Sequence, residues 1–182
     1  MRRALKTSPI RRRSRRGLSE MSFAVVRVRG SEQAGERVER TLRQLRLNKL
    51  NHLVFVRQDN AMIGMLETVK DYVTWGEVSA EMIAKVLMKR GKPIGKRRKL
   101  NDEFVKENSE KFKSVLSFAK AIQADEAMLD SVRNLQPVMR LHPPRGGYEN
   151  VKKSYRMGGS LGYRGKDIEA LLEQMIAPVK GG

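Results

Sequence analysis

Three short apolar runs separated by two amphipathic segments constrain the fold of this chain most strongly. The runs lie at residues 23–29, 52–56 and 72–76 and are rich in valine and aromatic residues, as is typical of β-strands. Between them, residues 34–45 and 60–71 carry apolar side chains at the spacing of an α-helix. A three-stranded sheet is stable only when a face is covered. The pattern therefore predicts a compact α+β unit of order βαβαβ, in which two helices pack on a small three-stranded sheet.

The first run, FAVVRVR, alternates near its end. Val26 and Val28 fall on one face of the strand, and Arg27 and Arg29 fall on the other. We therefore expect a half-exposed strand with both arginines in solvent. Ser31 follows the run and is expected to cap the first helix.

A second, mostly helical layer is predicted after residue 78. Ser79 is expected to cap its first helix, and residues 112–122 and 167–176 carry apolar stripes at helical spacing. The predicted organisation has three parts: a basic tail over residues 1–20, an α+β core over 21–78, and a helical extension with basic loops over 79–182.

Charge is sorted along the chain into three basic blocks. The 38 Lys and Arg residues outnumber the 20 Asp and Glu residues and give a formal charge of +18. Residues 1–20 hold eight cations and one acid, residues 85–99 hold eight cations and no acid, and residues 140–166 hold seven cations and one acid. The segments between these blocks are nearly neutral. Blocks of like charge are commonly interaction tails or loops, so the expected partner is a polyanion, with nucleic acid favoured over an anionic membrane surface.

The segment LHPPRGGYENVKKSYRMGGSLGYRG, residues 141–165, combines prolines, glycines, tyrosines and cations. Pro143 and Pro144 exclude a continuous helix or a central strand, so the segment begins as a loop. Such loops can follow an irregular backbone and stack on unpaired bases, as in the recognition of folded RNA. Double-stranded DNA is usually read by a basic helix, which this sequence lacks. A flexible solvated loop is the simpler alternative.

Several classes of chemistry have no support in the sequence. The absence of cysteine excludes disulfides, thiolate zinc sites and iron–sulfur clusters. His52 and His142 stand outside any metal or catalytic motif, and His52 is expected to be packed. The stretch GSLGYRGKD departs from a phosphate-binding loop at Ser160 and Asp167. We expect no enzymatic activity, no cofactor, no metal and no small-molecule substrate.

The sequence also gives no signal for membrane association or secretion. No run of about 18 apolar residues is present, and the first 20 residues lack the apolar stretch of a signal peptide. We expect a cytoplasmic protein with no membrane partner.

Four stretches together resemble one protein family. They are VRVRG, MLETVKDYVTWGE, MRLHPPRGG and GGSLGYRGKDIEALLEQM, and the resemblance spans about residues 22–177. They are similar to the archaeal form of the large-subunit ribosomal protein L-thirty, whose eukaryotic counterpart is L-seven. The resemblance implies a largely antiparallel three-stranded sheet with two helices, followed by a helical extension. It also implies a place in the large ribosomal subunit, bound to large-subunit ribosomal RNA and beside other ribosomal proteins, without catalysis.

Residues 1–20 precede the point where similar proteins usually begin, and Met21 stands where a start methionine would. Two explanations stay open for them: an arm that penetrates RNA, or a misplaced start. Contact with the small five-S ribosomal RNA also stays open. An RNA-processing or ribosome-assembly factor and a chromatin-type DNA binder are the rival functions.

The predicted RNA-binding residues are the cations of the basic blocks together with the glycines, tyrosines and histidine of the third block. They are Arg11, Arg12, Arg13, Arg15, Arg16, Lys92, Lys96, Arg97, Arg98, Lys99, His142, Arg145, Gly146, Gly147, Tyr148, Lys152, Lys153, Tyr155, Arg156, Gly158, Gly159 and Arg164. The cations are expected to neutralise phosphates, and the tyrosines and His142 to stack on bases. The glycines are expected to let the backbone approach the RNA closely.

Overall fold

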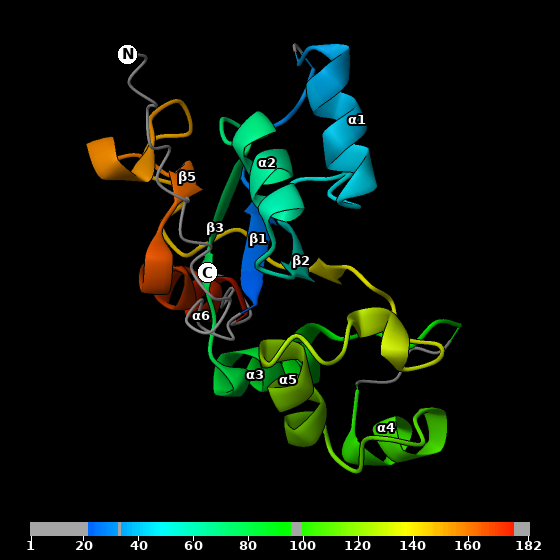
Figure 1. Ribbon diagram of the computed structural model, residues 1–182. Helices are drawn as coiled ribbons and strands as arrows, with labels where there is room; N and C mark the ends of the chain where they lie inside the picture. The colour runs from blue at the N-terminus through cyan, green and yellow to red at the C-terminus, as the bar shows by residue number, and fades with distance from the viewer. Residues whose placement is uncertain (1–21, 33, 96–99, 177–182) are drawn as a thin grey trace, which may run out of the picture.

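The computed structural model describes residues 22–32, 34–95 and 100–176 (Figure 1). Its strands are β1 (Phe23–Arg27), β2 (His52–Val56), β3 (Val73–Glu77), β4 (Met139–Arg140) and β5 (Gly162–Tyr163). Its α-helices are α1 (Glu36–Gln44), α2 (Asn60–Thr68), α3 (Ala80–Arg90), α4 (Asp102–Asn108), α5 (Val115–Gln123) and α6 (Ile168–Ile176). Short 3-10 turns form η1 (Leu129–Ser131), η2 (Tyr155–Met157) and η3 (Gly165–Asp167).

The described strands form one mixed sheet in the order β4-β2-β1-β3-β5. β1 pairs antiparallel with both β2 and β3, so the predicted α+β core with its three antiparallel strands is present. The prediction that the sheet stops at three strands is wrong. β4 adds antiparallel to β2, and β5 adds parallel to β3. Both added strands come from residues after 78, and the division of the chain at that residue stays a prediction.

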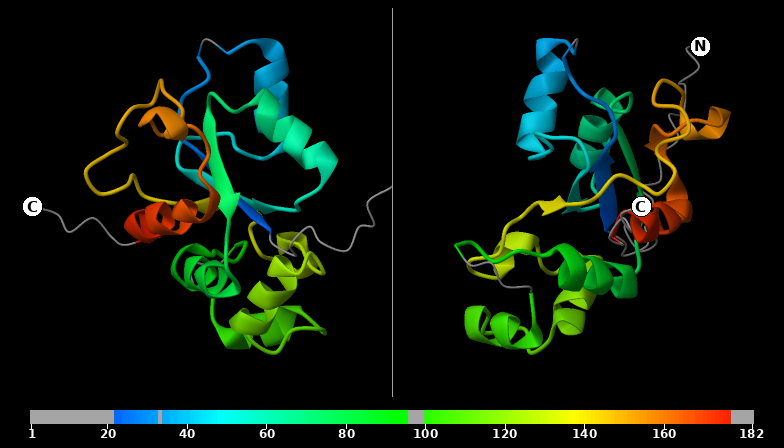
Figure 2. Two further views of the ribbon diagram at one scale, coloured as in Figure 1. Left: turned by 60° about the vertical axis from the view of Figure 1, so that its left-hand side comes forward. Right: turned by 180° about the vertical axis from the view of Figure 1, so that it is seen from behind.

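The sheet is buried on both faces, because a separate layer of helices covers each one (Figure 2). Phe23 and Val25 of β1 belong to a cluster with the apolar side chains of α1 and α2. Ala24 and Val26 point to the opposite face and belong to a cluster with α3, α5 and α6. The helical extension therefore covers the face that carries Val26, and α1 and α2 cover the face that carries Arg27, which the sequence pattern left exposed.

Arg27 corrects the expectation of a solvent-exposed face on the first strand. It is only 6% exposed, and its guanidinium donates to the carbonyl oxygens of Leu47 at 2.7 Å and Arg29 at 3.1 Å. A third hydrogen bond, of 2.8 Å, goes to the hydroxyl of Ser31. A buried charge is tolerated when its donors are hydrogen-bonded, and these three bonds satisfy donors of Arg27. Through them, Arg27 also joins the strand to the loops around α1.

Two expectations about helix starts have different outcomes. Ser31 does not cap α1, which begins at Glu36 after Gly35. Ser79 does cap α3, because its hydroxyl accepts from the amide of Met82 at 3.4 Å. Among the described residues, no helix combines the length and apolar character needed to cross a bilayer.

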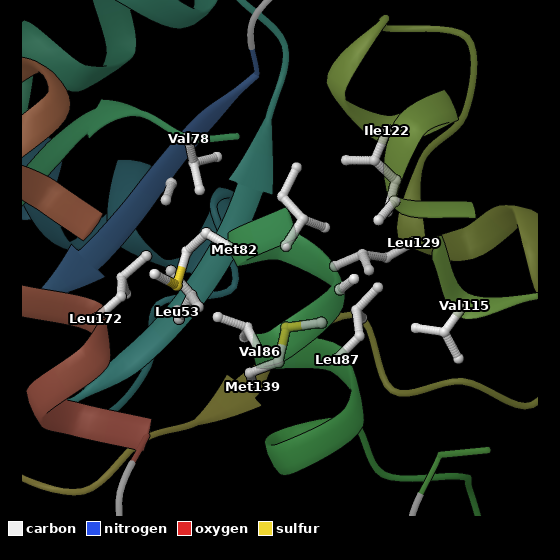
Figure 3. Packing of buried hydrophobic residues seen from close by; sticks show 14 of the residues in the cluster. Leu53, Val78, Met82, Val86, Leu87, Val115, Ile122, Leu129, Met139 and Leu172 are labelled. Carbon is white, nitrogen blue, oxygen red and sulfur yellow. The ribbon is translucent and has the colours of Figure 1, made fainter. Parts of the chain in front are cut away.

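The larger apolar cluster joins the sheet to the extension (Figure 3). Met82, Val86 and Leu87 of α3 lie at its centre, with Leu53 of β2 and Leu172 of α6 beside them. Burial of this kind contributes about 25 cal/mol per Å² of apolar surface. The core therefore fixes α6, and with it the segment between β4 and α6 that holds the third basic block.

Candidate nucleic-acid interface

The structure describes only part of the predicted RNA-binding set. Nine predicted residues lie outside the described ranges: Arg11, Arg12, Arg13, Arg15, Arg16, Lys96, Arg97, Arg98 and Lys99. The other predicted residues lie in two places. Lys92 follows α3, where its carbonyl accepts from the amide of Gln136 at 3.1 Å. The remainder belong to residues 142–164, which we call the basic loop and which lie on the opposite side of the molecule from the segment after α3 (Figures 1 and 2).

Hydrogen bonds within the basic loop define its backbone. The amide of Tyr155 donates to the carbonyl of Leu161 at 2.7 Å, and the amide of Gly159 donates to the carbonyl of Ser154 at 2.9 Å. A further bond of 2.9 Å joins the amide of Ser160 to the carbonyl of Asn150. These bonds fold the chain back on itself around η2. These hydrogen bonds favour an ordered segment over a flexible, solvated loop.

Arg164 attaches the basic loop to the sheet. Its backbone amide donates to the carbonyl of Trp75 at 2.8 Å, and its Nε donates to the hydroxyl of Thr74 at 3.0 Å. The same hydroxyl donates to the carbonyl of Gly162 at 2.9 Å, while Nη2 of Arg164 reaches the carbonyl of Ser160 at 3.3 Å. Thr74 is fully buried, and burial lowers the pKa of Arg164. Much of the donor capacity of Arg164 is therefore used inside the protein.

Two tyrosines reinforce this attachment. The guanidinium of Arg164 lies over the ring of Tyr155, 4.4 Å from its centroid, as in a cation–π contact. The hydroxyl of Tyr155 donates to Asp167 at 2.9 Å, and this hydrogen bond raises the pKa of the tyrosine. Tyr163 donates to the carboxylate of Glu77, which raises the pKa of Tyr163 to about 12.

The glycines of the basic loop have two different roles. Gly146 and Gly147 have φ values of 82° and 80°, a conformation that other residues rarely adopt, and they form an exposed turn. Gly158 ends η2 with a φ of 74°. Gly159 is buried, and a Cβ there would lie 2.1 Å from the carbonyl oxygen of Lys153. Gly159 therefore allows the loop to close on itself.

Four predicted cations of the basic loop remain exposed: Arg145, Lys152, Lys153 and Arg156. In the described part of the chain, ion pairs within 4 Å involve other residues, so these four charges have no acidic partner there. They are available to phosphate groups. We call them the free cations of the basic loop.

Tyr148 and His142 are less available for stacking than the sequence suggested. Tyr148 packs against the larger apolar cluster and donates its hydroxyl to Asn51 at 2.7 Å, and burial raises its pKa. His142 is half-buried, and its amide donates to the carbonyl of Met175 at 3.1 Å. Contact of either ring with RNA stays a prediction. His52 is packed as expected, and burial lowers its pKa.

A hollow of about 460 Å³ brings six predicted residues together beside α6. We call it the loop hollow, and its lining includes Arg145, Gly146, Gly147, Tyr148, Tyr155 and Arg164. Lys152, Lys153 and Arg156 lie outside it. In the described ranges, no group of three His, Asp or Glu side chains could hold a metal ion.

No sequence pattern indicated the partners that position this segment. Asn51, Thr74 and Glu77 lie 97, 90 and 86 positions before the loop residues that they bind. Ordinary polar residues in such positions have no local pattern that distinguishes them. Only Gly159 could be singled out from the sequence, because the glycine pair to which it belongs suggested a close approach of the backbone.

Comparisons with known proteins agree with the architecture. Residues 23–73, which run from β1 into β3, match the model of the family described as ribosomal protein L30p/L7e. The chain is 46% identical over 154 residues to large ribosomal subunit protein uL30 of Methanobrevibacter smithii, covering 85% of this chain and 99% of the relative. The uL30 proteins of Methanopyrus kandleri and Thermoplasma volcanium are 49% and 44% identical over 141 and 156 residues, covering 76% and 86% of this chain and 93% of each relative.

The similarity is high and covers nearly the full length of these relatives, and it agrees with the resemblance carried by the sequence motifs. The chain belongs to the uL30 family of large ribosomal subunit proteins.

Proposed function

We propose that this protein is a structural constituent of the large ribosomal subunit that binds and stabilises folded large-subunit ribosomal RNA. The observation that carries the proposal is the set of free cations on the basic loop, Arg145, Lys152, Lys153 and Arg156, which are exposed and have no acidic partner in the described part of the chain. The backbone of the loop is already folded and attached to β3. An ordered cationic loop loses little conformational entropy on binding, so little of its electrostatic attraction to RNA is offset by the cost of ordering.

The free cations are proposed to contact phosphates, and the turn at Gly146 and Gly147 to let the RNA backbone come close. Arg145 stands beside this turn and offers five donors in a planar group that matches phosphate geometry. Lys92 is proposed as a second contact on the far side of the molecule. The predicted cations outside the described residues would add further phosphate contacts.

The proposed partners are large-subunit ribosomal RNA and neighbouring ribosomal proteins. Contact with the five-S ribosomal RNA is an additional proposal, and it rests on the expected position in the subunit alone. Membership of a family of ribosomal structural proteins favours this role over an RNA-processing enzyme. Co-sedimentation of the protein with large subunits after a wash in high salt tests the assignment, and turnover of RNA by the isolated protein would refute it.

The role of the free cations can be tested through the salt dependence of binding. Each phosphate contact contributes about 0.7 to 0.9 to the slope of log affinity against log salt concentration. Replacing all four free cations with glutamine should therefore reduce this slope by about 3 to 4. It should also lower the affinity for large-subunit ribosomal RNA at low salt, as measured by filter binding between about 50 and 200 mM salt.

A matched control removes the same charge from another exposed surface. Four lysines in the mildly acidic part of the extension serve this purpose: Lys106, Lys111, Lys113 and Lys120. Their replacement with glutamine should leave most of the slope unchanged. If the two quadruple variants had equal slopes, the free cations would have no specific role in RNA binding. The binding would then reflect general electrostatic attraction.

A further inference from the structure

The loop hollow combines features that suit a nucleobase better than a phosphate. Two arginines, Arg145 and Arg164, and two carboxylates, Glu149 and Asp167, line it, so the hollow has no net formal charge. Carboxylates repel phosphate, and they accept hydrogen bonds from amino and imino groups. The hollow therefore favours a neutral ligand that presents donors, while Arg145 can neutralise charge outside it.

One wall of the hollow offers a stacking surface. Tyr155 and Arg164 both line it and are stacked on each other, with the guanidinium carbon 4.4 Å from the centroid of the ring. Arg164 is held in this position by Thr74 at 3.0 Å and by Ser160 at 3.3 Å. Unpaired bases stack on both arginine and aromatic planes when proteins recognise folded RNA. This wall is fixed before a ligand arrives, so little entropy would be lost in forming it.

The size of the hollow also suits a single nucleoside. Its volume of about 460 Å³ falls in the range of small-molecule sites, roughly 300 to 1,000 Å³. Leu171 and Ala170 of α6 contribute apolar surface, and Gln174 adds an amide that can donate and accept. A stretch of double helix would not enter a hollow of this size, whereas one base turned out of a loop or bulge would.

We propose that the loop hollow holds one unstacked guanosine of the RNA bound by this protein. Guanine presents an imino and an amino donor side by side on its Watson–Crick edge, which matches the carboxylate oxygens that line the hollow. The base would stack against the Tyr155 and Arg164 pair, and Arg145 would contact the adjoining phosphate. This inference rests on the proposed RNA-binding function and adds to it a base-specific contact.

Chemical probing of the RNA tests the inference. Kethoxal modifies guanines whose Watson–Crick edge is free, and hydroxyl radicals cut the exposed backbone. The full-length protein is bound to large-subunit ribosomal RNA extracted from the source cells, and both reactions are compared with RNA alone. We expect one unpaired guanine to become at least fivefold less reactive within the backbone footprint of the protein.

Two variants link that protection to the hollow. Ala170→Phe places a ring in the hollow from an exposed position of α6 and should restore the reactivity of that guanine without removing the backbone footprint. Ala61→Phe adds the same ring at an exposed position of α2, far from the hollow in sequence, and should leave the protection intact. Glu149→Gln removes an exposed carboxylate and should restore part of the reactivity even if the first variant folds poorly.

The possible results separate the two proposals. A backbone footprint without a protected guanine, or a protected guanine that Ala170→Phe and Glu149→Gln leave unchanged, would overturn the base contact while leaving RNA binding in place. The absence of any footprint would overturn the proposed function and the base contact together.

Discussion

The close approach of β3 to η3 gives the most quantitative test of this architecture. A Cβ on Gly76 would lie 1.9 Å from the carbonyl oxygen of Gly165, whereas real Cβ atoms essentially never approach closer than 3.0 Å. Gly76→Ala therefore requires the two backbones to separate by about 1 Å. Overpacking of this kind typically costs about 1 to 3 kcal/mol. At an m-value of about 2 kcal/mol per molar urea, a loss of about 2 kcal/mol lowers the midpoint of unfolding by about 1 M.

The same substitution at another glycine provides the control. Gly64 lies inside α2, is exposed, and has no atom within 4 Å of an added Cβ. Gly64→Ala should stabilise the protein by about 0.5 to 1 kcal/mol, because alanine loses less conformational freedom in a helix. The two variants should thus shift the urea midpoint in opposite directions. A midpoint for Gly76→Ala at or above that of the wild type would refute the tight contact between β3 and η3, the turn that follows the basic loop.

Three further outcomes follow from individual contacts. Asp59 accepts from the amide three residues later at 2.6 Å, so Asp59→Ala should cost about 1 kcal/mol in urea unfolding, whereas Asn101→Ala should cost less because Asn101 makes no capping bond. Burial, aided by Arg140, lowers the pKa of His52 from 6.5, so the folded state resists protonation. The stability present above pH 6.5 should therefore be lost as the pH falls below it, and His52→Gln should flatten this decline between pH 7 and 5, as measured by thermal melting. Arg164→Lys cannot keep both side-chain bonds of Arg164, so it should lower the melting temperature and the affinity for RNA without changing the salt slope, since a lost phosphate contact would reduce that slope by about 0.7 to 0.9.

The sequence by itself determined the elements whose signals are local. Apolar runs rich in valine and aromatic residues located the three long strands, and the 3.6-residue period located α1, α2, α3, α5 and α6, because these patterns depend only on neighbours along the chain. The prolines and glycines after residue 142 indicated a loop, and the charge count located the basic block. The family resemblance could also be recognised from short motifs alone.

The tertiary structure decided which of these residues are free to act. β4 and β5 contain two residues each, too few for any periodicity, so only pairing with β2 and β3 defines them as strands. Arg27 and Arg164 looked like surface cations, yet distant carbonyl and hydroxyl groups take up their donors and leave the charge of the loop to residues such as Arg145. The sequence does not distinguish a buried arginine from an exposed one. Its role depends on partners brought close by the packing of the helical extension on the sheet, and no local pattern records those contacts.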